Sequence, residues 1–313
     1  MYGRRRYTYE REPRVSKYRL DQMTWPEIKR EAEERRVILQ PVAAIEQHGP
    51  HLPVDTDNLI VGALCEAAAK ANPSEFIVAP TIPYGFNDHN MEFPGTVSIR
   101  PTVLLEYLFD VGRSFAASGF DRVLWVNGHG SNETVVELAA RRVTNETPAL
   151  SASTSSLALG RVVAERVPEL RTSPHGGVAH ACEFETSFYL HLAPELVREN
   201  LIADEMPTGF PPSIDHDWMG GGPLTFMTWY SQRTRSGVEG APTHASREKG
   251  ARLFGECVDL LVELARSFRD LDLPERIDHR PQPAWKDGLS FPQASTTESR
   301  TDTASRNFGD EEG

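Results

Sequence analysis

Three times in the first half of the chain, a short apolar run is followed by a longer segment with helical periodicity. The apolar runs, typical of buried strands, cover residues 36–45, 75–85 and 121–130, and the helical segments that follow them cover 57–71, 102–119 and 131–146. This alternation is typical of βαβ units, which place parallel strands in one sheet and helices on its faces. The sequence therefore predicts an α/β fold with a mostly parallel central sheet.

The rest of the chain is expected to add two helices to the domain and a polar segment at each end. One helix is predicted from His180 to about Leu192, and a last amphipathic helix from about His244 to Arg269. The basic head and the Pro-, Ser- and Thr-rich tail have compositions typical of segments without a core. We predict a flexible extension over 1–20, a single domain over 21–277 and a disordered tail over 278–313.

The charge balance argues against polyanionic partners. The 313 residues include 45 Asp and Glu but 33 Lys and Arg, which gives a net charge of -12. Because phosphate-rich partners need clustered cations, we expect neither nucleic acid nor an anionic membrane as a partner. No apolar run is long enough to span a membrane, and the basic head lacks the apolar stretch of a signal peptide. The cysteines Cys65, Cys182 and Cys257 show no CxxC spacing, which favours a reduced, cytoplasmic protein.

Three segments directly follow the predicted strands, and ligands of parallel α/β folds bind beyond the carboxyl ends of the strands. These segments are 46–57, 85–95 and 127–132, and we expect them to converge.

The first segment lies within "PVAAIEQHGPHLPVDTDN" and contains two histidines and three acidic residues. Glu46 and His48 are two residues apart, so that in an extended chain both side chains point to one side. Asp57 begins the following helix, near its positive end. Carboxylates and imidazoles suit Zn, Mn or Fe ions, so a metal site is one interpretation. A polar surface loop is the other, and in either case we expect His51 and Asp55 to support the loop.

The third segment, "WVNGHGSN", places His129 between Gly128 and Gly130, two residues that let the backbone approach a ligand closely. The alternative is a Gly-rich turn whose histidine is only hydrogen bonded. Metal-type ligands at two strand ends favour a metal site over a chance arrangement.

A later motif, "HACEFETS", allows two arrangements. If it is helical throughout, His180, Glu183 and Ser187 share one face. If the helix begins only after Cys182, His180 and Glu185 meet instead. Carboxylates in such an apolar helix are costly without a cation, and the alternative is a half-exposed helix with solvated carboxylates.

The motifs "EQHGPHLPVDTD", "FPGT", "NGHGSN" and "HACEFETS", in this order, resemble those of the creatininase family of metal-dependent amidohydrolases. The resemblance covers about residues 36–265. It implies a three-layer αβα sandwich, a site with two divalent metal ions (Zn, Mn or Fe), a hexamer, and hydrolysis of a non-peptide or cyclic C-N amide bond.

The resemblance also assigns roles to individual residues. The metal ligands it implies, with Asp57 as the bridge between the ions, are Glu46, His48, Asp57 and His129. Creatininase completes its second metal site with a glutamate two residues after the third-strand histidine. This chain has Ser131 at that position. Glu185 is the candidate that replaces the missing glutamate as a ligand. His180 resembles the family's proton-transfer histidine, and Glu183 is a second catalytic candidate. The residues expected to face substrate are Asn87, His89, Gly128, Gly130, Ser131, Trp218 and Trp229.

The family usually has a serine and a histidine where this chain has Asn87 and Asn90, which puts creatinine itself in doubt as the substrate. We expect a small-molecule amide, such as a cyclic amide, lactam or ureide, to be cleaved by attack of a metal-bound hydroxide. Trp218 and Trp229 either close over this substrate or are ordinary packing residues. The alternatives are a formamide hydrolase that acts on an N-formyl substrate, and a non-catalytic binding or assembly protein with a degenerate site. A phosphoesterase is disfavoured because the motifs lack a basic phosphate clamp.

Overall fold

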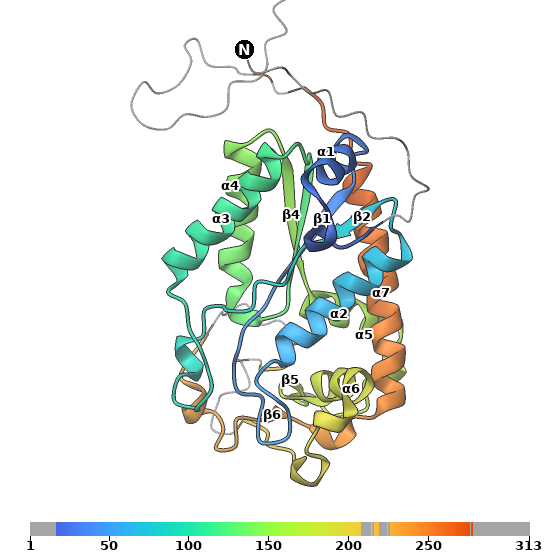
Figure 1. The fold of residues 1–313 in the computed structure, drawn as a ribbon. Coiled ribbons are helices and arrows are strands. Elements are labelled where there is room, and N and C mark those ends of the chain that lie inside the picture. Colours follow the sequence, from blue (N-terminus) through green and yellow to red (C-terminus); the bar gives the residue numbers. More distant parts are fainter. Residues whose placement is uncertain are drawn as a thin grey trace, which may run out of the picture. The chain divides into compact units, whose positions relative to one another are not determined.

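A four-stranded parallel sheet forms the centre of the fold (Figure 1). The computed structural model describes residues 17–207, 214, 216–218, 224, 226–275 and 277. In order across the sheet, the strands are β2 (Phe76–Val78), β1 (Val37–Val42), β3 (Arg122–Asn127) and β4 (Leu150–Ser155). Strands β1, β2 and β3 confirm the three predicted strands. The sequence "LSASTS" of β4 was not predicted, because it has no apolar run.

Helices connect the parallel strands and cover both faces of the sheet. The three connecting helices begin and end within about two residues of their predicted bounds and are α2 (Thr56–Ala71), α3 (Pro101–Ala117) and α4 (Glu133–Glu146). The remaining helices are α1 (Trp25–Glu33), α5 (Ser156–Arg166), α6 (Glu183–Leu192) and α7 (Arg247–Arg269). Neither α1 nor α5 was predicted.

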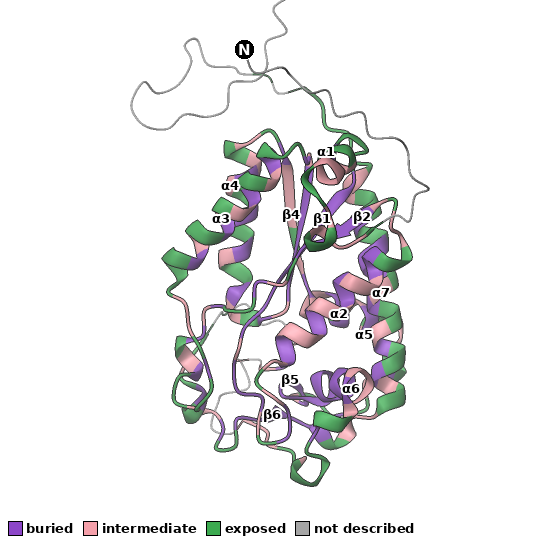
Figure 2. Ribbon diagram, in the orientation of Figure 1, coloured by how far each residue is buried: buried purple, intermediate pink, exposed green. Residues whose placement is uncertain are grey.

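Alternate residues of the strands point to two separate cores, which makes the fold a three-layer αβα sandwich. On one face, Leu39 and Leu124 pack with side chains of α2, α5 and α7. On the other face, Val123 and Trp125 pack with side chains of α3 and α4. Figure 2 shows β1, β2 and β3 buried, β4 mostly of intermediate burial, and the outer faces of these helices exposed. The predicted α/β class and layer order are confirmed.

A small antiparallel pair, β5 (Val178–His180) with β6 (Glu239–Gly240), lies next to α6. The predicted start of this helix at His180 was wrong, because His180 ends a strand and α6 begins only at Glu183. Ala181, at a positive φ of 50°, makes the sharp change of direction between them. The second arrangement considered for "HACEFETS" is therefore the correct one.

The predictions for the two ends of the chain fall mostly on residues 1–16 and 278–313, which lie outside the described residues. The described residues nearest the N-terminus contact the sheet, since the Val78 N-H donates a hydrogen bond to the Tyr18 carbonyl over 2.8 Å. Within the described part of the chain, no helix combines the length and apolar character needed to cross a membrane.

Candidate metal centre

The segments that follow β1, β2 and β3 converge, as the sequence predicts. Asn132 joins all three, because its amide nitrogen donates to the Ala43 carbonyl over 3.0 Å and its amide oxygen accepts from the Phe86 N-H over 2.9 Å. This use of its side chain also explains why Asn132, the residue before α4, does not cap that helix through its side chain. The loops are thereby fixed at the carboxyl edge of the sheet.

One group of candidate ligands gathers around His129. Its Nδ1 atom lies 2.9 Å from Glu46 Oε1 and 3.2 Å from Asp57 Oδ2. Its other ring nitrogen, Nε2, lies 3.0 Å from the Phe86 carbonyl oxygen and is placed to donate its proton there. The Nδ1 lone pair then faces the carboxylates, which is the usual arrangement of a histidine that binds a metal ion.

A second group gathers around His48 and shares Asp57 with the first. His48 Nε2 lies 3.4 Å from Asp57 Oδ1 and 3.7 Å from Glu185 Oε1. Its Nδ1 atom lies 3.3 Å from the Glu46 carbonyl, which orients the ring from behind. Asp57 is thus the residue common to both groups, in the position that a bridging ligand requires.

Burial and charge set the protonation of these groups. Burial lowers the pKa of His48, but the nearby Asp57 and Glu185 carboxylates outweigh it and hold that pKa well above its usual range. The pKa of His129 is likewise raised to about 10, because Glu46 and Asp57 outweigh its burial. Burial raises the pKa of Asp57, but the two histidines outweigh it and leave that pKa below its usual range. The site therefore favours added positive charge, which protons or metal ions can supply.

The chain's own atoms fit divalent metal ions. His48 Nε2 and Asp57 Oδ2 are buried and have no hydrogen-bond partner among the described residues. A buried ring nitrogen and a buried carboxylate oxygen that lack hydrogen-bond partners are costly unless a cation lies beside them. In addition, the ligand atoms of His48, Asp57 and Glu185 all lie within 4.8 Å of one another. The donor set of imidazoles and carboxylates suits Zn, Mn or Fe.

His180 lies beside the two groups of ligands. Its ring centroid is 4.3 Å from that of His48, and its Nδ1 atom is 3.9 Å from Glu46 Oε1. The Nε2 atom lies 2.7 Å from the Gln47 carbonyl oxygen, which is placed to accept its proton and leaves Nδ1 with the free lone pair. Burial and the neighbouring His48 lower the pKa of His180 to about 3.

Glu183, the other catalytic candidate, is not brought to the cluster. Its buried carboxylate accepts hydrogen bonds from the backbone N-H groups of Thr172, at 2.9 Å, and Ser173, at 3.1 Å, and forms an ion pair with Lys249. Because α6 begins at Glu183 rather than at His180, Glu183 and Glu185 point to different surroundings. The structure contradicts a place for Glu183 at the catalytic centre and makes it a structural tie between α6 and α7.

The residues expected to face substrate differ in their burial and in their contacts. Asn87 is fully buried, and neither atom of its amide has a hydrogen-bond partner among the described residues. His89 Nε2 lies 3.1 Å from Ser131 Oγ, so these two side chains form a pair. Trp229 is 46% exposed, whereas the adjacent Tyr230 is buried.

The backbone N-H of Gly128, a residue expected to face substrate, is bonded within the protein. Its backbone N-H donates to the Val42 carbonyl over 2.7 Å, and a Cβ atom there would lie 2.9 Å from Val61 and 3.0 Å from the Asp57 carbonyl. Gly128 is therefore required for close packing against α2. A Cβ atom at Gly130, in contrast, would meet no atom within 4 Å.

Sequence reasoning noted Asn90 only as a departure from the family pattern, and it missed Tyr230. Asn90 donates to Glu46 Oε2 over 2.5 Å and accepts from Gln47 over 3.1 Å, so it orients a ligand carboxylate. Its place just before "FPGT", where the family usually has a histidine, was the available signal. The Tyr230 ring lies 4.8 Å from that of His180 and 5.4 Å from that of His89. No signal marked Tyr230 apart from its position next to Trp229.

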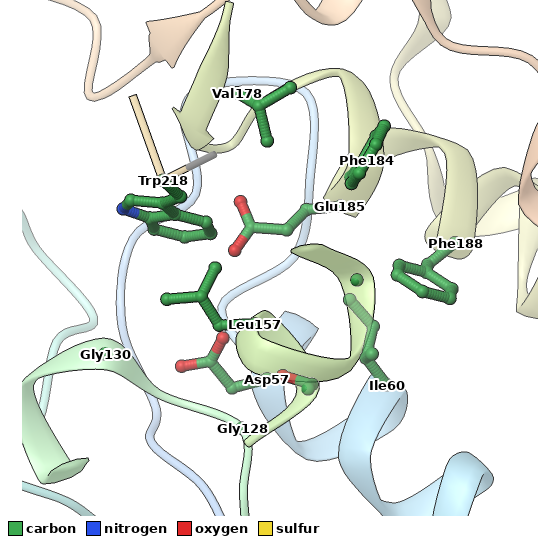
Figure 3. Close-up of a pocket in the computed structure, with 12 residues that line it drawn as sticks. Asp57, Ile60, Gly128, Gly130, Leu157, Val178, Phe184, Glu185, Phe188 and Trp218 are labelled. Atoms are coloured by element: carbon green, nitrogen blue, oxygen red, sulfur yellow. The ribbon is translucent and has the colours of Figure 1, made fainter. Parts of the chain in front are cut away.

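A pocket opens beside the second group of ligands (Figure 3). Asp57 and Glu185 form part of its wall, and Figure 3 shows Leu157 and Trp218 beside their carboxyl groups. The backbone N-H of Trp218 donates to the Val178 carbonyl over 2.8 Å, which fixes the main chain of this tryptophan to β5. The apolar side chains that line the pocket are Ile60, Leu157, Val178, Phe184, Phe188 and Trp218. The pocket therefore offers an apolar surface next to candidate metal ligands.

The family model for creatininase, described as creatinine amidohydrolase, matches residues 21–265. The chain belongs to the creatininase family. Members of this family are metal-dependent amidohydrolases that act on non-peptide or modified substrates, which confirms the predicted enzyme class.

Several creatininase-family relatives differ in their reactions. The mycofactocin precursor peptide peptidase of Mycobacterium ulcerans is 33% identical over 250 residues, which cover 75% of this chain and 83% of that protein. The 3-dehydro-scyllo-inosose hydrolase of Thermotoga maritima is 28% identical, and the match covers 83% of this chain and 88% of that protein. The creatinine amidohydrolase of Pseudomonas putida is also 28% identical, with 78% and 95% covered.

Solved creatininase structures share the fold and contain metals. A creatininase with Mn is similar with a TM-score of 0.67 and 25% identity, and the match covers 81% of this chain and 99% of that one. A mutant creatininase of Zn-Zn type has the same TM-score at 26% identity, with 81% and 99% covered.

Proposed function

We propose that this creatininase-family protein hydrolyses an amide C-N bond of a small, uncharged molecule with the aid of two divalent metal ions. The observation that carries the proposal is the pair of ligand groups that share Asp57, with His48 Nε2 and Asp57 Oδ2 unpartnered between them. Glu46, Asp57 and His129 would hold one ion, and His48, Asp57 and Glu185 would hold the other.

The residues around the ions have separate tasks. Divalent ions at such a site polarise an amide carbonyl and lower the pKa of a water molecule to roughly 7. His180 is placed to receive the proton of that water on Nδ1 and to return it to the departing nitrogen, while the Gln47 carbonyl holds its Nε2-H. Asn90 keeps the Glu46 carboxylate in place.

The pocket indicates what kind of group the substrate carries. Among the described residues, its lining contains no Lys or Arg, and Leu157, Phe184 and Trp218 provide much of the apolar wall. An apolar substituent next to the scissile bond would be buried there, and a negatively charged one would lose its hydration and face the Asp57 and Glu185 carboxylates. We therefore expect an apolar substituent rather than the compact polar ring of creatinine.

A peptide-derived substrate is a second candidate. It is favoured by the identity of 33% to a mycofactocin precursor peptide peptidase, compared with 28% to a creatinine amidohydrolase. An apolar side chain of a peptide would suit the same pocket. The formamide alternative predicts a different product, formate.

An activity screen tests the proposal. The purified chain is loaded separately with Mn, Zn or Fe and assayed against cyclic ureas, lactams, N-formyl compounds and short peptides with an apolar end. We expect release of an amine and a carboxylate, and the variant His180→Asn should bind metal but turn over slowly. Two bound ions without turnover of any compound class would count against this proposal and favour a binding protein.

Assembly and location remain predictions from the resemblance and the cysteine pattern. We propose a homo-oligomer, with a hexamer as the expected size, in the cytoplasm. The mass of the purified protein in solution tests the oligomer, and fractionation of the source cells tests the location.

A further inference from the structure

His89 belongs to a third group of facing ligand atoms. Suitable atoms of Glu46, His89 and His129 all lie within 4.8 Å of one another. Two ligand atoms that bind one zinc ion at about 2.1 Å lie at most about 4.2 Å apart. His89 is therefore within a small side-chain movement of the position that a ligand requires.

The neighbours of His89 show which way its ring nitrogen faces. The Asn90 side-chain NH₂ group, which can only donate, lies 3.4 Å from His89 Nε2 and also donates to Glu46 Oε2 over 2.5 Å. Ser131 Oγ lies 3.1 Å from the same nitrogen. The Asn90 NH₂ group can only donate and the Ser131 hydroxyl is able to donate, so Nε2 is placed to carry a lone pair, beside the Glu46 carboxylate.

Because residue 131 is a serine, the His89 side chain has room beside it. A serine hydroxyl is short, and it contacts the imidazole where a longer acidic side chain would compete with it. Aromatic rings hold the other sides of the imidazole: His129 is stacked at 6.2 Å, Tyr230 lies at 5.4 Å and Phe86 at 6.4 Å between centroids. His89 is thus held in place by neighbours on several sides, as a metal ligand must be.

We propose that His89 is a ligand of the first metal ion, together with Glu46, Asp57 and His129. This inference rests on the proposed two-metal function. The first ion would then have four side-chain ligands from the protein, whereas the second would have three, His48, Asp57 and Glu185. Closed four-ligand sites are typical of tightly held metal, and three-ligand sites keep a position for water or substrate. The two ions should therefore differ in affinity, with the second as the exchangeable one.

Metal binding alone tests this inference, without any substrate. The apo protein is titrated with Co²⁺ and Zn²⁺, and bound metal is counted by elemental analysis after dialysis against a graded chelator. We expect the unmodified chain to retain one ion at chelator concentrations that remove the other. His89→Gln should weaken the tighter site by about tenfold or more and change the visible Co²⁺ spectrum. His175→Gln is the matched control, because the His175 side chain is 71% exposed.

A second variant gives a direct sign of ligation. In His89→Cys, a thiolate bound to Co²⁺ adds a charge-transfer band in the near ultraviolet that the unmodified protein lacks, since burial raises the pKa of its own Cys65, Cys182 and Cys257 thiols. Two ions in His89→Gln with unchanged affinities and spectrum, and no new band in His89→Cys, would overturn the role of His89 and leave the two-metal function standing. An unmodified chain that binds no divalent ion would overturn both.

Discussion

Tyr189 donates a hydrogen bond from its hydroxyl to Asp55 Oδ1 over 2.8 Å, and this bond joins α6 to the loop that carries the first ligands. A second bond joins the same two elements, because His51 Nε2 lies 2.9 Å from Thr186 Oγ1. These two bonds flank the position where Glu185, from α6, faces Asp57, from α2. His51 and Asp55 thus hold two ligand-bearing elements in register.

Tyr189→Phe should lower the free energy of unfolding and weaken the second metal site. The loss of a hydrogen bond to a partly buried charged group costs about 1–3 kcal/mol, and a looser α6 moves Glu185 relative to Asp57. Chemical denaturation and Zn²⁺ titration measure the two effects. Tyr107→Phe is the control, since Tyr107 is 51% exposed. If Asp55→Asn and Tyr189→Phe have fully additive effects, the two residues are not coupled.

Asp57→Ala should remove both ions together. Asp57 faces both His129 and His48, so its loss deprives each site of a ligand. The affinity of both sites should fall by more than the roughly 10–100-fold that follows the loss of an outer hydrogen-bond partner. Elemental analysis and turnover check this outcome, with Asp110→Ala on the exposed side of α3 as the control. Retention of one tightly bound ion would show that Asp57 is not a bridge.

The contacts of Glu183 predict a pH-dependent contribution to stability. Burial raises the pKa of Glu183, but hydrogen bonds from Lys249, Ser173 and Thr172 outweigh it and lower that pKa below its usual range. A carboxyl whose pKa is lower in the folded state stabilises the fold above its unfolded pKa of about 4.3, and this contribution is lost as pH falls through the folded pKa.

Glu183→Gln should therefore be less stable than the unmodified chain at pH 7, by about 3–5 kcal/mol because Lys249 is left unpaired. The difference should shrink as the pH is lowered below 4. Urea denaturation at several pH values measures it, with Glu169→Gln on the surface as the control. Metal affinity per folded molecule should stay unchanged, and a specific loss of turnover at normal metal content would restore Glu183 as a catalytic residue.

Two glycines of the same loop should respond differently to alanine. Gly128→Ala places a Cβ atom against Val61 and the Asp57 carbonyl, so the start of α2 must move, at a cost of about 1–3 kcal/mol. Metal affinity should fall with it. Gly130→Ala meets no atom within 4 Å and should leave stability and metal binding near normal, while KM changes because Gly130 lines the pocket. Thermal unfolding and Zn²⁺ titration separate the two variants, and equal effects would contradict the packing role of Gly128.

The sequence predicted the parts of the fold that depend on strong local patterns. Strands β1 and β3 are continuous apolar runs, and α2 and α3 have clear helical periodicity, so each was found within a few residues. Strand β4 was missed because Ser151, Ser153 and Thr154 interrupt its apolar character, and it is defined by pairing with β3 instead. Long-range pairing of this kind leaves no periodic signal in the strand itself.

The same limit applies to the candidate metal centre. Glu46, His48 and Asp57 are close in sequence and could be grouped from spacing. The distinction between Glu183 and Glu185 depends on where α6 begins, which Ala181 and the pairing of β5 with β6 decide. Tyr230 lies near His180 because a later segment of the chain returns to the site. Residue spacing in the sequence does not predict this contact.

With His89 included, six side chains are assigned to the two ions, and they come from four stretches of chain that are far apart in sequence. Bound ions would join these stretches as a reversible cross-link and would reduce the freedom of the unfolded chain. Folding and metal supply are then coupled: a newly made chain that lacks metal would open more often and be exposed to proteases and chaperones for longer. The amount of this enzyme in a cell would in that case follow the availability of its metal, even at a constant rate of synthesis.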